Sequence, residues 1–69
     1  MDFTVNRIKQ IMKKQGIIQA DLAEITGISQ GDLSKIINGK KERVSLMSAA
    51  KISKALGYSV EHIWPKLFS

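Results

Sequence analysis

The chain has 69 residues and a mass of 7.7 kDa, which predicts a single domain with a small core. It contains no cysteine and one histidine, which excludes a disulfide framework and a thiolate metal site and argues against a zinc site. No apolar stretch is long enough to span a membrane, and Met1 leads into Asp2 rather than into a signal peptide. We therefore expect a cytoplasmic protein with no membrane partner.

The charge balance is basic. Eleven Lys and Arg residues against six Asp and Glu residues give a formal net charge of +5. On so short a chain, this balance indicates attraction to a polyanion, either nucleic acid or an anionic membrane surface. In many small proteins a basic balance serves only solubility. The positions of the charges must therefore decide between binding of a polyanion and solubility alone.

Four glycines divide the chain, and each follows a run with apolar residues at helical spacing. They are Gly16, Gly27, Gly39 and Gly57. Glycine is common just after helix C-termini, and no segment alternates with a period of two over a useful length. The sequence therefore predicts an all-α fold of five short helices, over residues 4–15, 19–26, 30–38, 46–56 and 60–67.

One face of each predicted helix is apolar and is expected to form the core. The expected inward positions are Val5, Ile8, Ile11, Met12, Ala20, Leu22, Ala23, Ile25, Leu33, Ile36, Ile37, Leu46, Met47, Ala49, Ala50, Ile52, Leu56, Val60, Ile63 and Trp64. Serines stand where side-chain N-caps are expected, at Ser29, Ser45 and Ser59. Lys13 and Lys14 are expected to form a solvated helix face, and His62 to lie at the surface.

The segment from residue 19 to residue 40 is the most informative. Two helices of about two turns each flank a short turn that contains Gly27. Ala23 is small enough to let the two helices approach closely, and Ile28 would fill the corner between them. These are the requirements of a helix-turn-helix, in which the later helix projects far enough to enter a DNA major groove.

This segment resembles the lambdoid phage repressor and Cro family, also called the Xre-type helix-turn-helix regulators. The matching pattern is Gln-x-x-Leu-Ala-x-x-x-Gly-Ile-Ser-Gln from Gln19, then Leu-Ser-x-Ile-x-Asn-Gly-Lys from Leu33. The similarity extends from about Val5 to Trp64 and includes the helix-ending glycines. A lone helix-turn-helix pattern would be a weak signal, whereas five helices in register are a strong one.

The resemblance implies a compact five-helix DNA-binding domain and assigns roles to single positions. Base contacts in the major groove are implied at Gln30, Gly31, Ser34 and Lys35. Contacts with the sugar-phosphate backbone are implied at Gln19, Ser29, Asn38, Lys40, Lys41 and Arg43. The amide of Gln30 offers one donor and one acceptor, which matches adenine N6 and N7. Gln19 is also expected to brace Gln30.

The sequence departs from the family pattern at several positions. Ile18 replaces a small polar N-cap, which removes one expected phosphate contact. Gly31 replaces a second base-contacting side chain, costs up to ~1 kcal/mol of helix stability, and lets the backbone approach the bases. Asp32 is interpreted as favouring the helix N-terminus rather than contacting cytosine. Met12 and Ile37 together replace a buried arginine–glutamate pair, so no unpaired charge is left in the core.

The implied function is sequence-specific binding of double-stranded DNA as a transcriptional regulator, most simply a repressor, in a bacterial cell or a phage-infected host. The family pairs two copies through the fifth-helix region, which sets two recognition helices ~34 Å apart on a pseudo-palindromic operator. The residues expected at this dimer contact are Trp64, Leu67 and Phe68, with Trp64 mainly in the core. We expect either a complete Cro-like regulator or the DNA-binding domain of a longer repressor.

A different function class stays open. An antitoxin-type module shares this fold and binds a protein partner, for which only residues 64–69 would be available here. An enzyme is not expected, because no Ser-His-Asp, Cys-His, metal-ligand or phosphate-loop arrangement occurs. No cofactor or small-molecule substrate is expected either.

Overall fold

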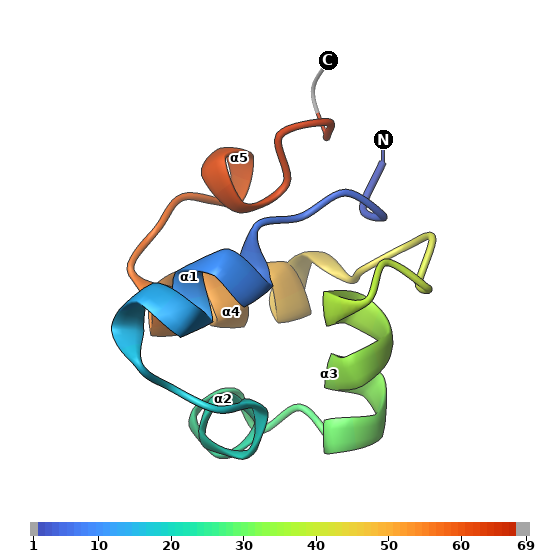
Figure 1. The fold of residues 1–69 in the computed structure, drawn as a ribbon. Coiled ribbons are helices and arrows are strands. Elements are labelled where there is room, and N and C mark those ends of the chain that lie inside the picture. The colour runs from blue at the N-terminus through green and yellow to red at the C-terminus, as the bar shows by residue number, and fades with distance from the viewer. Residues whose placement is uncertain (1, 68–69) are drawn as a thin grey trace.

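Five helices follow one another in the computed structural model, which describes residues 2–67. They are α1 (Ile8–Gln15), α2 (Gln19–Thr26), α3 (Gln30–Ile37), α4 (Leu46–Leu56) and α5 (Val60–Ile63). The described residues include no strand, and the predicted all-α fold is confirmed. In the view of Figure 1, α1 and α4 cross the centre, α2 lies below them, α3 stands at the right and α5 lies above. Among these helices, none is long and apolar enough to cross a membrane.

Three helices are shorter than the sequence predicts, and α3 differs only in that it ends at Ile37 rather than at residue 38. α1 begins at Ile8 rather than at residue 4, because the side chain of Asn6 accepts the backbone N–H of Ile8 at 3.0 Å and occupies the place of a preceding helical turn. Val5 therefore lies outside the helix and is exposed. α5 ends at Ile63 rather than at residue 67, because Pro65 disfavours a helical conformation at the residue before it.

The core is apolar and is shared by all five helices. Phe3, from the segment before α1, packs edge-on against Trp64, with ring centroids 5.6 Å apart. Met12 and Ile37 are both buried, so the expected replacement of an ion pair by apolar side chains holds in the structure. The fully buried large side chains are Ile8, Leu22, Leu33, Ile36, Ile52, Ile63 and Trp64.

Some apolar positions predicted for the core lie on the surface instead. They are Val5, Ala20, Ile25, Leu46, Met47 and Ala50. The inward face of α4 is set by Ala49, Ile52 and Leu56, whose three- and four-residue spacing leaves the first turn of the helix pointing outward. In the same way, the buried positions 22, 23 and 26 of α2 turn Ile25 toward solvent.

The three predicted serine N-caps are confirmed. In each, the side-chain oxygen accepts the backbone N–H of the third residue that follows, at 3.1–3.2 Å. Each contact satisfies one of the N–H groups that a helix start leaves without a partner. The capping serines are Ser29 for α3, Ser45 for α4 and Ser59 for α5.

The segment before α1 holds the C-terminal end of α3. Nδ2 of Asn6 donates to the carbonyl oxygens of Ile36 and Ile37 at 3.0 and 3.3 Å. The same segment is ordered by Thr4, whose hydroxyl and N–H both donate to the Asp2 carboxylate and hold the pKa of Asp2 below its ordinary value. These contacts connect the start of the chain to the last turn of α3.

Gly39 allows this connection to be close. It follows α3 with a φ of +69°, and a Cβ atom placed there would lie 2.4 Å from the carbonyl oxygen of Thr4. Gly16, at the end of α1, has a similar φ of +71°, but nothing lies within 4 Å of its Cβ position among the described residues. The two glycines therefore share a backbone conformation and differ in their surroundings.

We predict that Gly39→Ala destabilises the protein more than Gly16→Ala. A left-handed conformation costs an L-residue about 1–2 kcal/mol, and both variants incur that cost. Only the methyl group at position 39 also collides with backbone atoms. Urea unfolding followed by circular dichroism should show a loss of about 1–2 kcal/mol for Gly16→Ala and a clearly larger one for Gly39→Ala. Equal losses would contradict the close approach.

Candidate nucleic-acid interface

α3 has one buried face and one open face. Leu33, Ile36 and Ile37 are buried in the core. The opposite face carries all four positions that the sequence analysis implicates in base contacts. Gln30, Gly31 and Lys35 are exposed there, and Ser34 is half-buried. A helix with this division presents its polar face to a ligand without disturbing its packing.

Gly31 leaves a gap on this face. The residue is helical, and within the described residues no atom lies within 4 Å of the position that a Cβ would occupy. No packing requirement therefore explains the glycine at this position. It makes the first turn of α3 a place where a ligand can come close to the backbone.

The first turn of α3 is braced by α2. Nε2 of Gln19 donates to the backbone carbonyl oxygen of Gln30 at 3.1 Å. The expected brace between the two glutamines is thus present, and it reaches the backbone. Because the bond ends on the carbonyl oxygen, it does not use the side-chain amide of Gln30. Ile28 packs partly buried against the core, in the corner between the two helices.

Asn38, implicated in phosphate contact, is already bonded within its own helix end. Its Nδ2 donates to the backbone carbonyl of Ser34 at 2.8 Å and to the hydroxyl oxygen of Ser34 at 3.2 Å. An asparagine amide has two N–H donors, so both are in use. A phosphate bound by this amide would have to replace one of these contacts.

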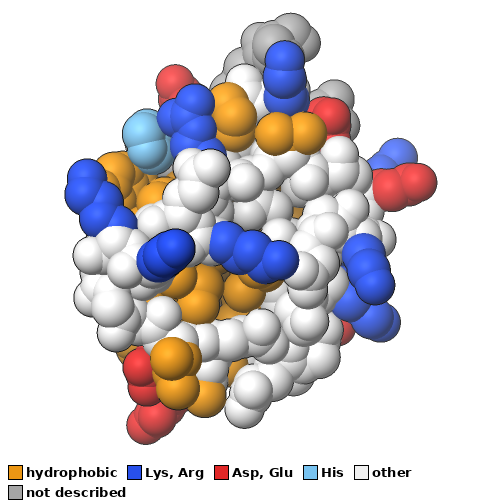
Figure 2. Space-filling model, viewed as in Figure 1, with side chains coloured by type: hydrophobic (Ala, Val, Ile, Leu, Met, Phe, Trp, Pro, Cys, Tyr) orange, Lys and Arg blue, Asp and Glu red, His pale blue; other side chains and the backbone are white. Residues whose placement is uncertain are grey.

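Basic side chains gather where α3 ends and the next loop begins. Lys35, Lys40 and Arg43 are exposed and Lys41 is half-buried. The loop leaves α3 in a fixed direction, because the N–H of Lys40 bonds to the carbonyl oxygen of Lys35 at 2.9 Å. Figure 2 shows Lys and Arg side chains on the side where α3 lies and also over α1.

A family model described as helix-turn-helix matches residues 8–63, from the first residue of α1 to the last residue of α5. The chain belongs to the Cro/C1-type helix-turn-helix family. No match was found among curated proteins. The resemblance in the sequence is confirmed, and the family binds DNA and is non-enzymatic. DNA binding is therefore the function of this helix-turn-helix protein.

The dimer contact expected at Trp64, Leu67 and Phe68 stays a prediction. Trp64 is fully buried, as expected for a residue mainly in the core, and Leu67 is buried within the single chain at the lining of a surface hollow. The burial of Leu67 follows from the early end of α5. The chain turns back after it, and the N–H of Leu67 bonds to the carbonyl oxygen of Trp64 at 3.1 Å. Phe68, the third residue, lies outside the described residues.

Sequence reasoning missed Asn6, although its contacts position the recognition helix. A capping residue type just before the first helix was a usable local signal, and the bond to the N–H of Ile8 matches it. Its second set of contacts is with carbonyl groups thirty residues away. No local pattern in the sequence indicates that pairing.

We predict that Asn6→Asp loosens the last turn of α3. A carboxylate still accepts the N–H of Ile8, but it cannot donate to the carbonyls of Ile36 and Ile37 and repels them instead. Stability should fall by about 1–3 kcal/mol. Hydrogen exchange of the amides in the last turn of α3 should become faster.

The matched control is Asn38→Asp, the same chemical change at an exposed asparagine whose bonds lie within one helix end. It should also loosen the last turn of α3, but because its bonds are exposed to water it should cost clearly less stability than Asn6→Asp. If both variants lost the same stability and showed the same exchange pattern, Asn6 would not be the anchor of α3.

Proposed function

We propose that this protein is a sequence-specific transcriptional regulator that binds a pseudo-palindromic DNA operator as a homodimer. Its simplest action is repression by occupancy of the operator, in a bacterial or phage-infected cell. The observation that carries the proposal is α3, an eight-residue helix with an apolar face in the core, a polar face outward and both ends bonded to the scaffold. Such a helix enters a major groove as one rigid body.

Base discrimination is proposed to reside on the open face of α3. The amide of Gln30 pairs with the N6 and N7 atoms of adenine, and Lys35 donates to O6 and N7 of guanine. Between Gln30 and Lys35, Ser34 contacts the base edges through the hydroxyl of its shorter side chain. At Gly31 the backbone itself approaches the base edges, because no side chain keeps them apart.

Affinity is proposed to come from contacts with the phosphate backbone on either side of α3. Gln19 is the first residue of α2, Ser29 caps the start of α3, and Asn38 follows the last residue of α3. Lys40, Lys41 and Arg43 follow the backbone from the loop after α3. Contacts of this kind fix the position of the protein on the duplex and carry no base information.

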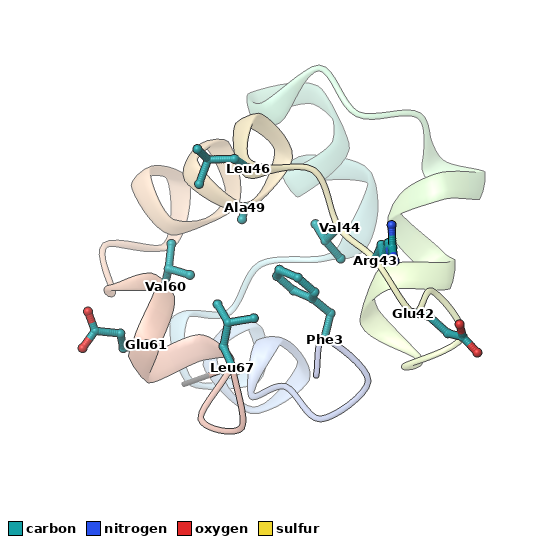
Figure 3. A pocket seen from close by; sticks show the side chains of 9 residues that line it. All are labelled: Phe3, Glu42, Arg43, Val44, Leu46, Ala49, Val60, Glu61 and Leu67. Atoms are coloured by element: carbon teal, nitrogen blue, oxygen red, sulfur yellow. The ribbon is translucent and has the colours of Figure 1, made fainter. Parts of the chain in front are cut away.

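Two copies are proposed to pair through a hollow between the segment before α1, the start of α4 and α5 (Figure 3). It has a volume of about 820 Å³ and is lined by Phe3, Glu42, Arg43, Val44, Leu46, Ala49, Val60, Glu61 and Leu67. Leu46 stands at its edge and is 83% exposed, so its side chain is available to a partner.

The composition of this hollow suits a two-fold contact. A two-fold axis brings the same patch of both copies together, so Leu46 of one copy enters the apolar hollow of the other. The rim carries an arginine, Arg43, and the carboxylates of Glu42 and Glu61. The patch is thus self-complementary in charge. A protein-partner module is the alternative function, and co-purification of a second protein in place of homodimers would favour it.

We predict that Gln30→Ala relaxes the preference for one base pair in each half-site. The loss of a bidentate amide contact should cost ~1–3 kcal/mol at the preferred base. Selection of bound sites from random duplexes measures this directly. The control is Lys40→Ala, which should weaken all sequences alike and lower the salt slope by about one. An unchanged base preference in the Gln30 variant would remove that residue from base readout.

We predict that Leu46→Glu weakens pairing without unfolding the protein. The variant loses the ~1.5–3 kcal/mol that burial of a leucine contributes at each of the two symmetric contacts, or roughly 10²- to 10⁴-fold in the dimerisation constant. Sedimentation equilibrium over a range of concentrations measures the mass. Ile25→Glu is the matched control, because Ile25 is also exposed, at 62%, and lies outside this hollow. Equal pairing by both variants would place the dimer contact elsewhere.

A further inference from the structure

The positive charge of the protein does not come from its helix-turn-helix. Residues 19–43 carry four acidic and four basic side chains, so their formal charge cancels. Residues 2–18 carry four basic side chains and one acidic one, and residues 44–67 carry three basic and one acidic. The net charge of +5 therefore lies outside the segment that is proposed to contact the operator.

The densest group of cations lies on α1 and at its N-cap Arg7, whose guanidinium lies 3.4 Å from Nδ1 of His62. Arg7, Lys9, Lys13 and Lys14 are all exposed, and no acidic residue occurs from residue 3 to residue 20. Lys9 and Lys13 are one helical turn apart and so project from the same stripe of the helix. Lys13 and Lys14 also favour the helix C-terminus. Lys9 lies outside that last turn, so attraction to the helix C-terminus does not explain why a cation stands at this position.

The outer faces of α1 and α3 point in different directions. Both helices turn their apolar sides to one core, α1 with Ile8 and Ile11 and α3 with Leu33 and Ile36. In Figure 1, α1 crosses the face toward the viewer, whereas α3 stands at the right. Figure 2 shows Lys and Arg side chains over α1 on that near face. A straight duplex bound along α3 would leave the cations of α1 open to another polyanion.

We propose that the outer face of α1, formed by Arg7, Lys9, Lys13 and Lys14, binds the phosphate backbone of a second DNA duplex. The protein then holds two DNA segments together, with the operator on α3 and any other duplex on α1. A row of cations with no acidic residue in its own segment releases counterions from phosphates and needs no base contact to do so. This inference rests on the proposed function, because it needs an operator bound on α3, and it adds a second DNA site to that function.

The burial of the other side of α1 decides between DNA and a membrane as the polyanion. A basic amphipathic helix binds a membrane by inserting its apolar face among the lipids. In α1 that face consists of Ile8, Ile11 and Met12, and all three are buried in the core. Insertion of α1 among lipids would therefore require unfolding, whereas binding to the phosphates of DNA uses the folded surface as it stands.

A two-duplex capture experiment tests the proposal. A duplex carrying the selected operator is immobilised and saturated with the protein, and a labelled duplex without the operator is then added at salt concentrations between about 50 and 200 mM. The test variant is K9Q/K13Q. The matched control is K51Q/K54Q, which removes two exposed lysines from α4.

Wild type and K51Q/K54Q should both retain the labelled duplex. K9Q/K13Q should retain ~10-fold less, with a salt slope lower by about 1.8, because two phosphate contacts are lost. All three should hold the immobilised operator equally well. Capture through the second recognition helix of a dimer would not respond to K9Q/K13Q, so equal capture by both variants would overturn the proposal.

Two other outcomes have separate meanings. If wild type holds the operator but retains no second duplex, the proposal for α1 fails while the proposed function stands. If no operator can be selected at all, the proposed function fails instead. If K9Q/K13Q weakens operator binding on a single duplex, α1 contacts the flank of the same DNA, which also overturns the proposal.

Discussion

The recognition helix depends on hydrogen bonds between side chains and backbone at both of its ends. An isolated helix of eight residues is not stable in water, and each helix end leaves backbone groups without partners. In α3, the cap from Ser29 and the brace from Gln19 hold the start, and Asn6 bonds to two carbonyl groups at the end. Buried apolar side chains hold the middle. The side chains on the outward face of α3 are therefore not needed to hold the helix in place.

This arrangement divides polar side chains into those used by the fold and those available to DNA. The amides of Gln19 and Asn38 are bonded within the protein, so contact between these residues and DNA is coupled to the position of α3. Gln30 contributes only its backbone carbonyl to the brace. If the proposed contacts form, a substitution at Gln19 would change both stability and DNA binding, whereas one at Gln30 would change the base contact and leave the brace in place.

The sequence predicted the features that depend on local patterns. The positions of the helices, the three serine caps and the turn of the helix-turn-helix follow from residues a few positions apart. Asn6 was missed because its carbonyl partners are thirty residues away. Leu46 was misplaced because periodicity alone does not show which positions of a first turn the core reaches. The burial of Leu67 within the single chain was not predicted, because it depends on the way in which the chain turns back after α5.

The charge distribution connects these features to selectivity. A segment in which basic and acidic side chains cancel gains little from counterion release as a whole. In the proposed complex, its local cations from Lys35 to Arg43 would have to hold the duplex against the carboxylates nearby. The weaker the contribution that is independent of sequence, the larger the share of binding that depends on base contacts. Attraction over longer distances then comes from α1 and the C-terminal half, where the excess of cations lies. Approach to DNA would thus depend on α1 and the C-terminal half, and discrimination among sites would depend on α3. Asn6 connects the segment before α1 to the end of α3.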